Sequence, residues 1–128
     1  MRYRLMDILA CPICKAFPLE LLVFDASKGE QKHRDKVGCE LYCVYHGGPT
    51  DHLDKAELVR DCEVCFSYDL KEALLTCKKC GRWYPVMDSI PHMLPDDLRK
   101  EAEDKQFLVK HSEKVPERVR KEGLPFHL

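Results

Sequence analysis

The apolar residues of this chain fall into short runs that are separated by polar stretches. An apolar cluster at residues 5–9 fits a short turn of helix, and the run PLELLVF at 18–24 is typical of a buried strand. Residues 74–76 and 82–87 predict a second and a third strand. Between them Gly81 stands where the chain has to turn back, a position at which a positive φ is common. The pattern therefore predicts three short strands that together make a small ribbon.

The segment between the first and second strands is more polar. Residues 27–36 form a charged run that indicates a solvated loop. Further on, Thr50 or Asp51 can cap a short helix that extends to about Arg60 and carries its apolar residues on one face. The predicted helix ends just before Cys62.

The charged end of the chain predicts another helix. Pro95 and the two aspartates that follow it suit a helix N-terminus, whereas Lys110 and Lys114 suit a helix C-terminus. We therefore expect a helix over about 96–113, whose incomplete apolar stripe either lies loosely on the domain or awaits a partner. Residues 116–128 are expected to be partly mobile.

Length and charge exclude several classes of protein. A chain of 128 residues with 45% apolar content fits one domain or a small core with an appendage, not a two-domain enzyme. With 21 basic and 22 acidic residues the formal net charge is −1, so the chain lacks the broad positive field of a dedicated nucleic-acid binder. No apolar run is long enough to span a membrane, and the first residues do not fit a secretory signal. We therefore expect a soluble, cytoplasmic protein without membrane contact.

Eight cysteines form the most informative pattern, because they fall into four close pairs. In a cytosolic chain such pairs are more typical of metal sites than of disulfides. Two residues between thiolates let one turn direct both sulfurs at one ion, and two such turns complete a tetrahedral site. The pairs are Cys11 with Cys14, Cys39 with Cys43, Cys62 with Cys65, and Cys77 with Cys80.

The spacing alone leaves the pairing of these turns open. The third and fourth pairs are close enough in sequence to form a compact site by themselves. In a nested scheme the first pair instead joins the last, and the two inner pairs meet inside the insertion. The strands that flank the outer pairs favour nesting. A closed site of four cysteines leaves no position for water or substrate, so its zinc would be structural rather than catalytic.

Three states are open to the inner four cysteines. They can bind a second zinc, form one or two disulfides, or stay reduced. The chain has no Asn and 34% charged residues, a composition typical of heat-adapted proteins, in some of which intracellular disulfides persist. His33, His46 and His52 lie close by in sequence, but histidines near loops are more often solvated, so none is assigned as a ligand.

Two segments carry a resemblance to a known family. Residues 5–14 read LMDILACPIC, and residues 75–94 read LTCKKCGRWYPVMDSIPHML. With these parts in this order, the chain resembles the methyltransferase-activator subunit family over residues 1–24 and 74–98. Ser89 stands where a glycine is common in that family, and neither the inner cysteines nor the tail beyond residue 98 is general to it.

The resemblance implies a fold, a cofactor and a partner. It implies a small α+β fold, in which a three-stranded zinc ribbon at 1–24 plus 74–94 carries a mainly helical inserted domain at 25–73. The residues themselves add a charged helical tail at 95–128. The resemblance also implies a non-catalytic subunit bound as a heterodimer to a Rossmann-like, S-adenosylmethionine-dependent methyltransferase that modifies tRNA, rRNA or release factor. RNA would then be contacted only indirectly. One structural zinc is assigned to Cys11, Cys14, Cys77 and Cys80.

An apolar stripe near the last strand suggests where such a partner would bind. A thin ribbon cannot bury all of these side chains, because alternate strand residues point to opposite faces. An exposed apolar edge invites a partner strand, and the alternative is that the stripe packs on the inserted helices. We take residues 83–94 as the candidate interface, namely Trp83, Tyr84, Val86, Met87, Ile90, Pro91, Met93 and Leu94.

Two other functions are compatible with the sequence. An autonomous RNA-binding ribbon would use Lys78, Lys79 and Arg82 beside the aromatic residues, although three cations make a weak patch. A rubredoxin-like redox protein would hold iron on the same turns. The chain has no GxGxxG, P-loop, nucleophile elbow or HExxH motif, so we do not expect it to be an enzyme.

Overall fold

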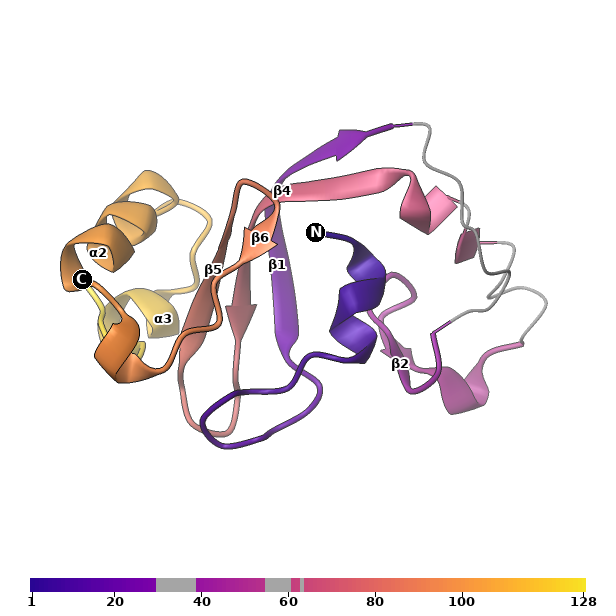
Figure 1. Cartoon of the computed structure of the whole chain (residues 1–128), viewed down its shortest axis with the longest axis horizontal. Coiled ribbons are helices and arrows are strands. Elements are labelled where there is room, and N and C mark those ends of the chain that lie inside the picture. The colour runs from indigo at the N-terminus through magenta and orange to yellow at the C-terminus, as the bar shows by residue number, and fades with distance from the viewer. Residues whose placement is uncertain (30–38, 55–60, 63) are drawn as a thin grey trace.

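An antiparallel sheet lies at the centre of the molecule. The computed structural model describes residues 1–29, 39–54, 61–62 and 64–128, and all statements below concern these residues. Within them, the main sheet has the strand order β1-β4-β5-β6, with every neighbouring pair antiparallel (Figure 1). Its strands are β1 (Glu20–Lys28), β4 (Tyr68–Thr76), β5 (Trp83–Met87) and β6 (Ile90–Pro91).

The three predicted strands are present, but two of them are longer than the pattern indicates. β1 continues past Phe24 and β4 begins at Tyr68, and the two strands pair from Glu20 opposite Thr76 to Lys28 opposite Tyr68. The sheet thus crosses both predicted borders between ribbon and insertion, and the division into domains stays a prediction. The first half of β4 gives no apolar signal, because it contains Asp69, Lys71 and Glu72. Only its end, residues 73–75, is a continuous apolar run, which is buried on both faces of the sheet.

The described part of the insertion is not mainly helical. It contains a second, two-stranded sheet of β2 (Tyr42–Cys43) and β3 (Gly48–Pro49), followed by a 3₁₀ turn, η2 (Thr50–His52). A longer helix was predicted here, extending to about Arg60. In the described residues it is represented by this turn alone, and Leu53, which follows the turn, has an extended backbone. Residues 55–60 lie outside the described part. A short helical stretch within 61–66 then carries the third cysteine pair.

The C-terminal region, including part of residues 116–128, is packed against the sheet. The helix predicted over 96–113 is interrupted, since a 3₁₀ turn, η3 (Asp96–Leu98), is separated by two extended residues from α2 (Glu101–Lys110). The interruption allows Arg99 to turn inward, where its guanidinium donates to the Trp83 carbonyl at 2.7 Å. After α3 (Glu117–Glu122), the last residues return to the start of β5.

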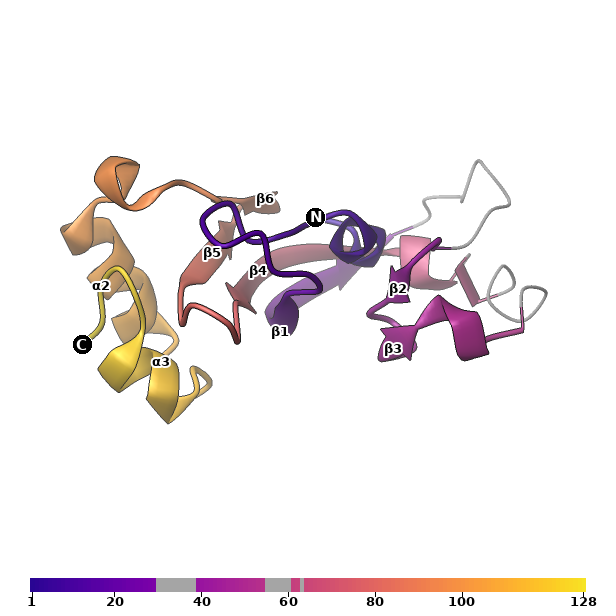
Figure 2. The ribbon, with the colours of Figure 1, turned by 90° about the horizontal axis from the view of Figure 1, so that it is seen from below.

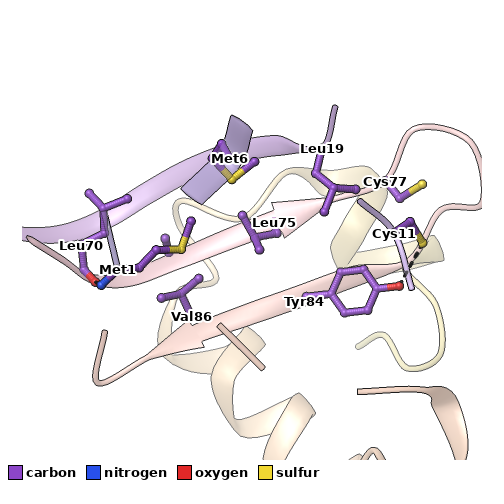
Figure 3. Close-up of a cluster of buried hydrophobic side chains, with 10 residues drawn as sticks. Met1, Met6, Cys11, Leu19, Leu70, Leu75, Cys77, Tyr84 and Val86 are labelled. Atoms are coloured by element: carbon purple, nitrogen blue, oxygen red, sulfur yellow. Dashed lines mark hydrogen bonds between the residues drawn. The ribbon is translucent and has the colours of Figure 1, made fainter. Parts of the chain in front are cut away.

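The two faces of the sheet bury two separate cores. One face is covered by the N-terminal segment, which contains the 3₁₀ turn η1 (Tyr3–Asp7), and the other by α2 and α3 (Figures 1 and 2). Alternate residues of β5 therefore belong to different cores, as the pleat requires. The first core is drawn in Figure 3 and includes Met1, Met6, Cys11, Leu19, Leu70, Leu75, Cys77, Tyr84 and Val86. The second contains Leu74, Trp83, Phe107, Leu108, Val115 and Val119.

None of the helices in the described ranges is long and apolar enough to cross a membrane.

Candidate metal centre

The first and last cysteine pairs meet at one end of the sheet. The sulfurs of Cys11, Cys14, Cys77 and Cys80 all lie within 4.8 Å of one another. Cys11 Sγ is 3.6 Å from Cys80 Sγ, and Cys14 Sγ is 3.4 Å from Cys77 Sγ. The nested arrangement is thus the one that the structure adopts.

The first of the two loops that bring these sulfurs together spans residues 11–16. The Lys15 N–H donates to the Cys11 carbonyl at 2.9 Å, and the Cys11 N–H donates to the Ala16 carbonyl at 2.9 Å. Lys15 has a φ of 65°, which closes the turn. The loop also directs the N–H of Cys14 at the Cys11 sulfur. A charge on this sulfur is thereby stabilised by the backbone.

The second loop, residues 77–82, repeats the same bonds. The Gly81 N–H donates to the Cys77 carbonyl at 3.1 Å, and the Cys77 N–H donates to the Arg82 carbonyl at 2.9 Å. Gly81 has the predicted positive φ, at 75°. Here the N–H of Cys80 is directed at the Cys77 sulfur. The sequence therefore builds two turns of one form, facing each other.

The electrostatic setting of the sulfurs differs between the two loops. Burial acts to raise the pKa of Cys11, but the N–H of Cys14 and the Tyr84 hydroxyl, 3.1 Å from the sulfur, together lower it to about 6 (Figure 3). Burial raises the pKa of Cys77. A metal ion would offset that cost, since a coordinating thiol is deprotonated outright. The Tyr84 hydroxyl was not identified from the sequence as a partner of the site, and a tyrosine in a strand gives no signal of that role.

The four thiolate donors fit a metal ion that prefers tetrahedral coordination by sulfur, such as zinc. Zinc–sulfur bonds of about 2.3 Å place neighbouring sulfurs of a tetrahedron about 3.8 Å apart. The Cys14–Cys77 and Cys11–Cys80 sulfur separations, 3.4 and 3.6 Å, are slightly shorter than this, so small movements of the side chains would admit the ion. The four sulfurs occupy all positions of such an ion and leave none for a substrate.

The inner cysteines lie apart from this centre. All eight cysteines are free thiols in the structure, and the exposed fractions of Cys39, Cys43, Cys62 and Cys65 are between 3% and 8%. Among the described residues, the outer quartet is the one group of three or more metal-binding side chains whose donor atoms all lie within 4.8 Å. His46, not assigned from the sequence, has Nδ1 3.2 Å from Cys43 Sγ. His33 lies outside the described residues, and the side chain of His52 is not described.

Only part of the predicted docking stripe is accessible. Ile90 is 58% exposed and Leu94 is 40% exposed. The start of β5 is buried, because the N-terminal segment covers one of its faces and the C-terminal helices, not inserted helices, cover the other. Docking of a partner on this stripe stays a prediction. The fully buried members of the stripe are Trp83, Tyr84 and Val86, and the partly buried ones are Met87, Pro91 and Met93.

The three cations considered for RNA contact are not equivalent. Arg82 donates through two nitrogens to the carboxylate of Asp96, at 2.9 and 2.7 Å, so its guanidinium is already engaged. Lys78 is well exposed and 3.9 Å from a Glu20 carboxylate oxygen. RNA contact through Lys78 and Lys79 stays a prediction.

The structure also shows a buried carboxylate that sequence patterns did not reveal as functional. Asp7, in η1, accepts three backbone N–H groups at 2.7–2.8 Å, from Glu40, Leu41 and Tyr42. It thereby fixes the start of the second sheet to the N-terminal turn. An aspartate followed by an apolar pair gives no local sign of partners so distant in sequence.

Comparison with known proteins gives one family. The family model described as Trm112p-like protein matches residues 2–45, about a third of the chain. This is the family of methyltransferase activator subunits, so the resemblance drawn from the sequence is confirmed. The matched range contains Cys11 and Cys14 but ends before the other half of the metal centre. A search of curated proteins found no match.

Proposed function

Starting from the resemblance to the Trm112p-like family, whose members are partners of methyltransferases, we propose that this chain is a non-catalytic activator subunit. Its partner would be an S-adenosylmethionine-dependent enzyme that modifies tRNA, rRNA or translation release factor. The observation that carries the proposal is the convergence of Cys11 and Cys14, inside the matched range, with Cys77 and Cys80 from the distant hairpin. The chain would stabilise and position its partner rather than react.

In this proposal the metal is zinc and its role is structural. Zinc supplies no reaction chemistry in a closed site of four thiolates; it holds the fold together. It would link residues 11–14, ahead of β1, to residues 77–80, between β4 and β5. The Tyr84 hydroxyl and the N–H groups of the two loops would hold the thiolates in position, as outer partners commonly do at metal sites.

The docking surface would lie at the β6 edge of the sheet. β6 is the end strand of the order β1-β4-β5-β6, so one side of it has no neighbour within the main sheet. Ile90 and Leu94 are the accessible apolar side chains of the predicted stripe here. A partner strand or apolar groove would cover them, with main-chain hydrogen bonds adding affinity. Trp83, Tyr84 and Val86 would support this edge from inside.

The proposal is tested by capture and activation of a partner. We expect affinity purification of the chain from its own cells to recover a methyltransferase, and this enzyme to transfer methyl groups faster with the chain than without it. Recovery of the chain always alone, or an enzyme equally active without it, would refute the proposal. The absorption spectrum separates zinc, which is silent, from a rubredoxin-like iron centre, which is coloured.

Substitution at the surface tests the interface itself. We expect Ile90→Asp with Leu94→Asp to lower partner affinity at least tenfold, because two charges would be buried against an apolar surface. Val109→Asp is the matched control, since Val109 is an apolar side chain 62% exposed on α2, which is not part of the proposed edge. Unchanged capture by the double variant, with its metal content and circular dichroism intact, would place the interface elsewhere.

A further inference from the structure

A third loop of the chain has the same backbone form as the two loops of the metal centre. It spans residues 43–48, between β2 and β3. The Gly47 N–H donates to the Cys43 carbonyl at 2.9 Å, and Gly47 has a φ of 80°. Cys43 pairs with Gly48, just as the first cysteine of each outer loop bonds the residue five positions later. The chain thus forms this turn three times.

The ligand positions of the third loop are filled by a cysteine and a histidine. In the outer loops, the residue three positions after the first cysteine is the second cysteine, and its N–H is directed at the first sulfur. In the third loop that residue is His46, and its N–H is likewise directed at the Cys43 sulfur. Its Nδ1 lies 3.2 Å from the same sulfur. His46 therefore stands where the outer loops carry their second ligand.

The far side of the His46 ring is already held in the orientation that a metal ligand needs. Nε2 lies 2.9 Å from a carboxylate oxygen of Asp61. Histidines that bind metals almost always donate their other ring N–H to a carboxylate, carbonyl or water, which fixes the tautomer and the ring. With the proton on Nε2, Nδ1 carries the free lone pair on the side of Cys43.

Two further cysteines follow Asp61 closely in the chain. Asp61 lies among the described helical residues 61–62 and 64–66, which include Cys62 and Cys65, each 5% exposed. The thiols of both residues interact electrostatically with that of Cys43. The bond from His46 to Asp61 thus ties the loop to the turn that holds two further buried thiols.

Cys39 has a different position. Its thiol interacts electrostatically with those of Cys43 and Cys62, and its apolar contacts are with Cys43 and Leu53. It lies outside the loop, where the place of the second ligand is taken by His46. On this loop geometry Cys39 is a neighbour of the site rather than a ligand.

From these observations we propose a second tetrahedral metal site formed by Cys43, His46, Cys62 and Cys65. Three thiolates and an imidazole suit zinc. Because the outer quartet is the one described group within 4.8 Å, these four donor atoms have to move closer together when the ion binds. The inference is independent of the proposed function, since it concerns metal binding by the isolated chain.

Metal stoichiometry tests this site directly. We expect native mass spectrometry of the full chain loaded with zinc to show two ions per chain, and one ion for His46→Ala or for Cys62→Ser with Cys65→Ser. Cys39→Ser is the matched control and should retain both ions. One ion on the unaltered chain would overturn the proposal, as would loss of an ion in Cys39→Ser together with its retention in His46→Ala.

X-ray absorption at the zinc edge gives a second measurement that needs no variant. Two sites as proposed contain seven thiolates and one imidazole, and the imidazole adds outer-shell scattering that a thiolate does not. We expect that scattering in the two-zinc protein. Two ions with sulfur scattering alone would overturn the assignment of His46.

Discussion

Single residues join parts of this chain that are far apart in sequence. Asp7 has a carboxylate that is buried and accepts three N–H groups from residues 40–42. Burial acts to raise its pKa, but those N–H groups and nearby Arg4 hold it below the usual value. A lowered pKa means that the folded state favours the charged form, and this makes the anchor sensitive to acid.

Asp7→Asn should therefore destabilise the protein near neutral pH. The amide can still accept at one oxygen, but the N–H of Glu40 loses its partner, which costs about 1–3 kcal/mol. The stabilisation by Asp7 is present above the unfolded pKa of about 3.9 and is lost as pH falls through the lower, folded pKa. Urea unfolding at pH 7 and in acid should show the difference between variant and parent shrink in acid.

An exposed aspartate provides the comparison for this measurement. Asp97 is exposed in η3. Asp97→Asn should change the free energy of unfolding by less than about 0.5 kcal/mol at either pH. An equal loss of stability from Asp7→Asn at both pH values would contradict a role for the charge of Asp7.

At the scale of elements, the C-terminal segment contacts β5 directly. The Trp83 N–H donates to the Leu124 carbonyl at 3.2 Å, and its indole N–H donates to the Phe126 carbonyl at 2.9 Å. Gly123 lies at the end of α3 with an ordinary φ of −63°. A Cβ there would meet the Val119 carbonyl oxygen at 2.5 Å and Trp83 Cδ1 at 2.8 Å. The glycine is required by packing, not by backbone strain.

Gly123→Ala should consequently loosen the C-terminal segment. The methyl group overpacks a site that includes backbone, which typically costs 1–3 kcal/mol. Trp83 is the one tryptophan of the chain, so its fluorescence reports the change directly. Gly29→Ala is the control, because a Cβ added at Gly29 would have the Ser67 carbonyl oxygen, 4.0 Å away, as its nearest neighbour among the described residues. A variant with unaltered emission and unfolding midpoint would show that the segment does not press on Trp83.

The elements also show what the sequence can and cannot predict. The strands and the turn at Gly81 follow from apolar runs and turn residues, which are local signals. The bounds of the C-terminal helix were predicted less well. Phe107 and Leu108 are the α2 residues in the second core, and two buried apolar residues are too few to give a helical repeat in the sequence. The turn at His46 was not predicted, although Gly47 follows His46 as Gly81 follows Cys80. Gly47 was the residue in the sequence that could have indicated this turn.

At the scale of the whole molecule, the outer metal centre closes the chain on itself. It joins residues 11–14 to residues 77–80 and lies against the first core, which Cys11 and Cys77 complete. Structural zinc contributes on the order of 10 kcal/mol. The net stability of a domain of this size is about 5–15 kcal/mol. A zinc ion bound there would therefore account for most of the free energy of unfolding of this fold.

Removal of the two proposed ions should consequently have unequal effects. We expect Cys77→Ser with Cys80→Ser to abolish cooperative thermal unfolding by circular dichroism, because the first core loses the link between its two halves. Cys62→Ser with Cys65→Ser should leave a cooperative transition, lowered by several degrees, since β2 and β3 lie outside the main sheet. Chelation of the unaltered chain should resemble the outer variant. If the outer variant instead melts like the parent, burial in the two cores, rather than the metal, holds this fold together.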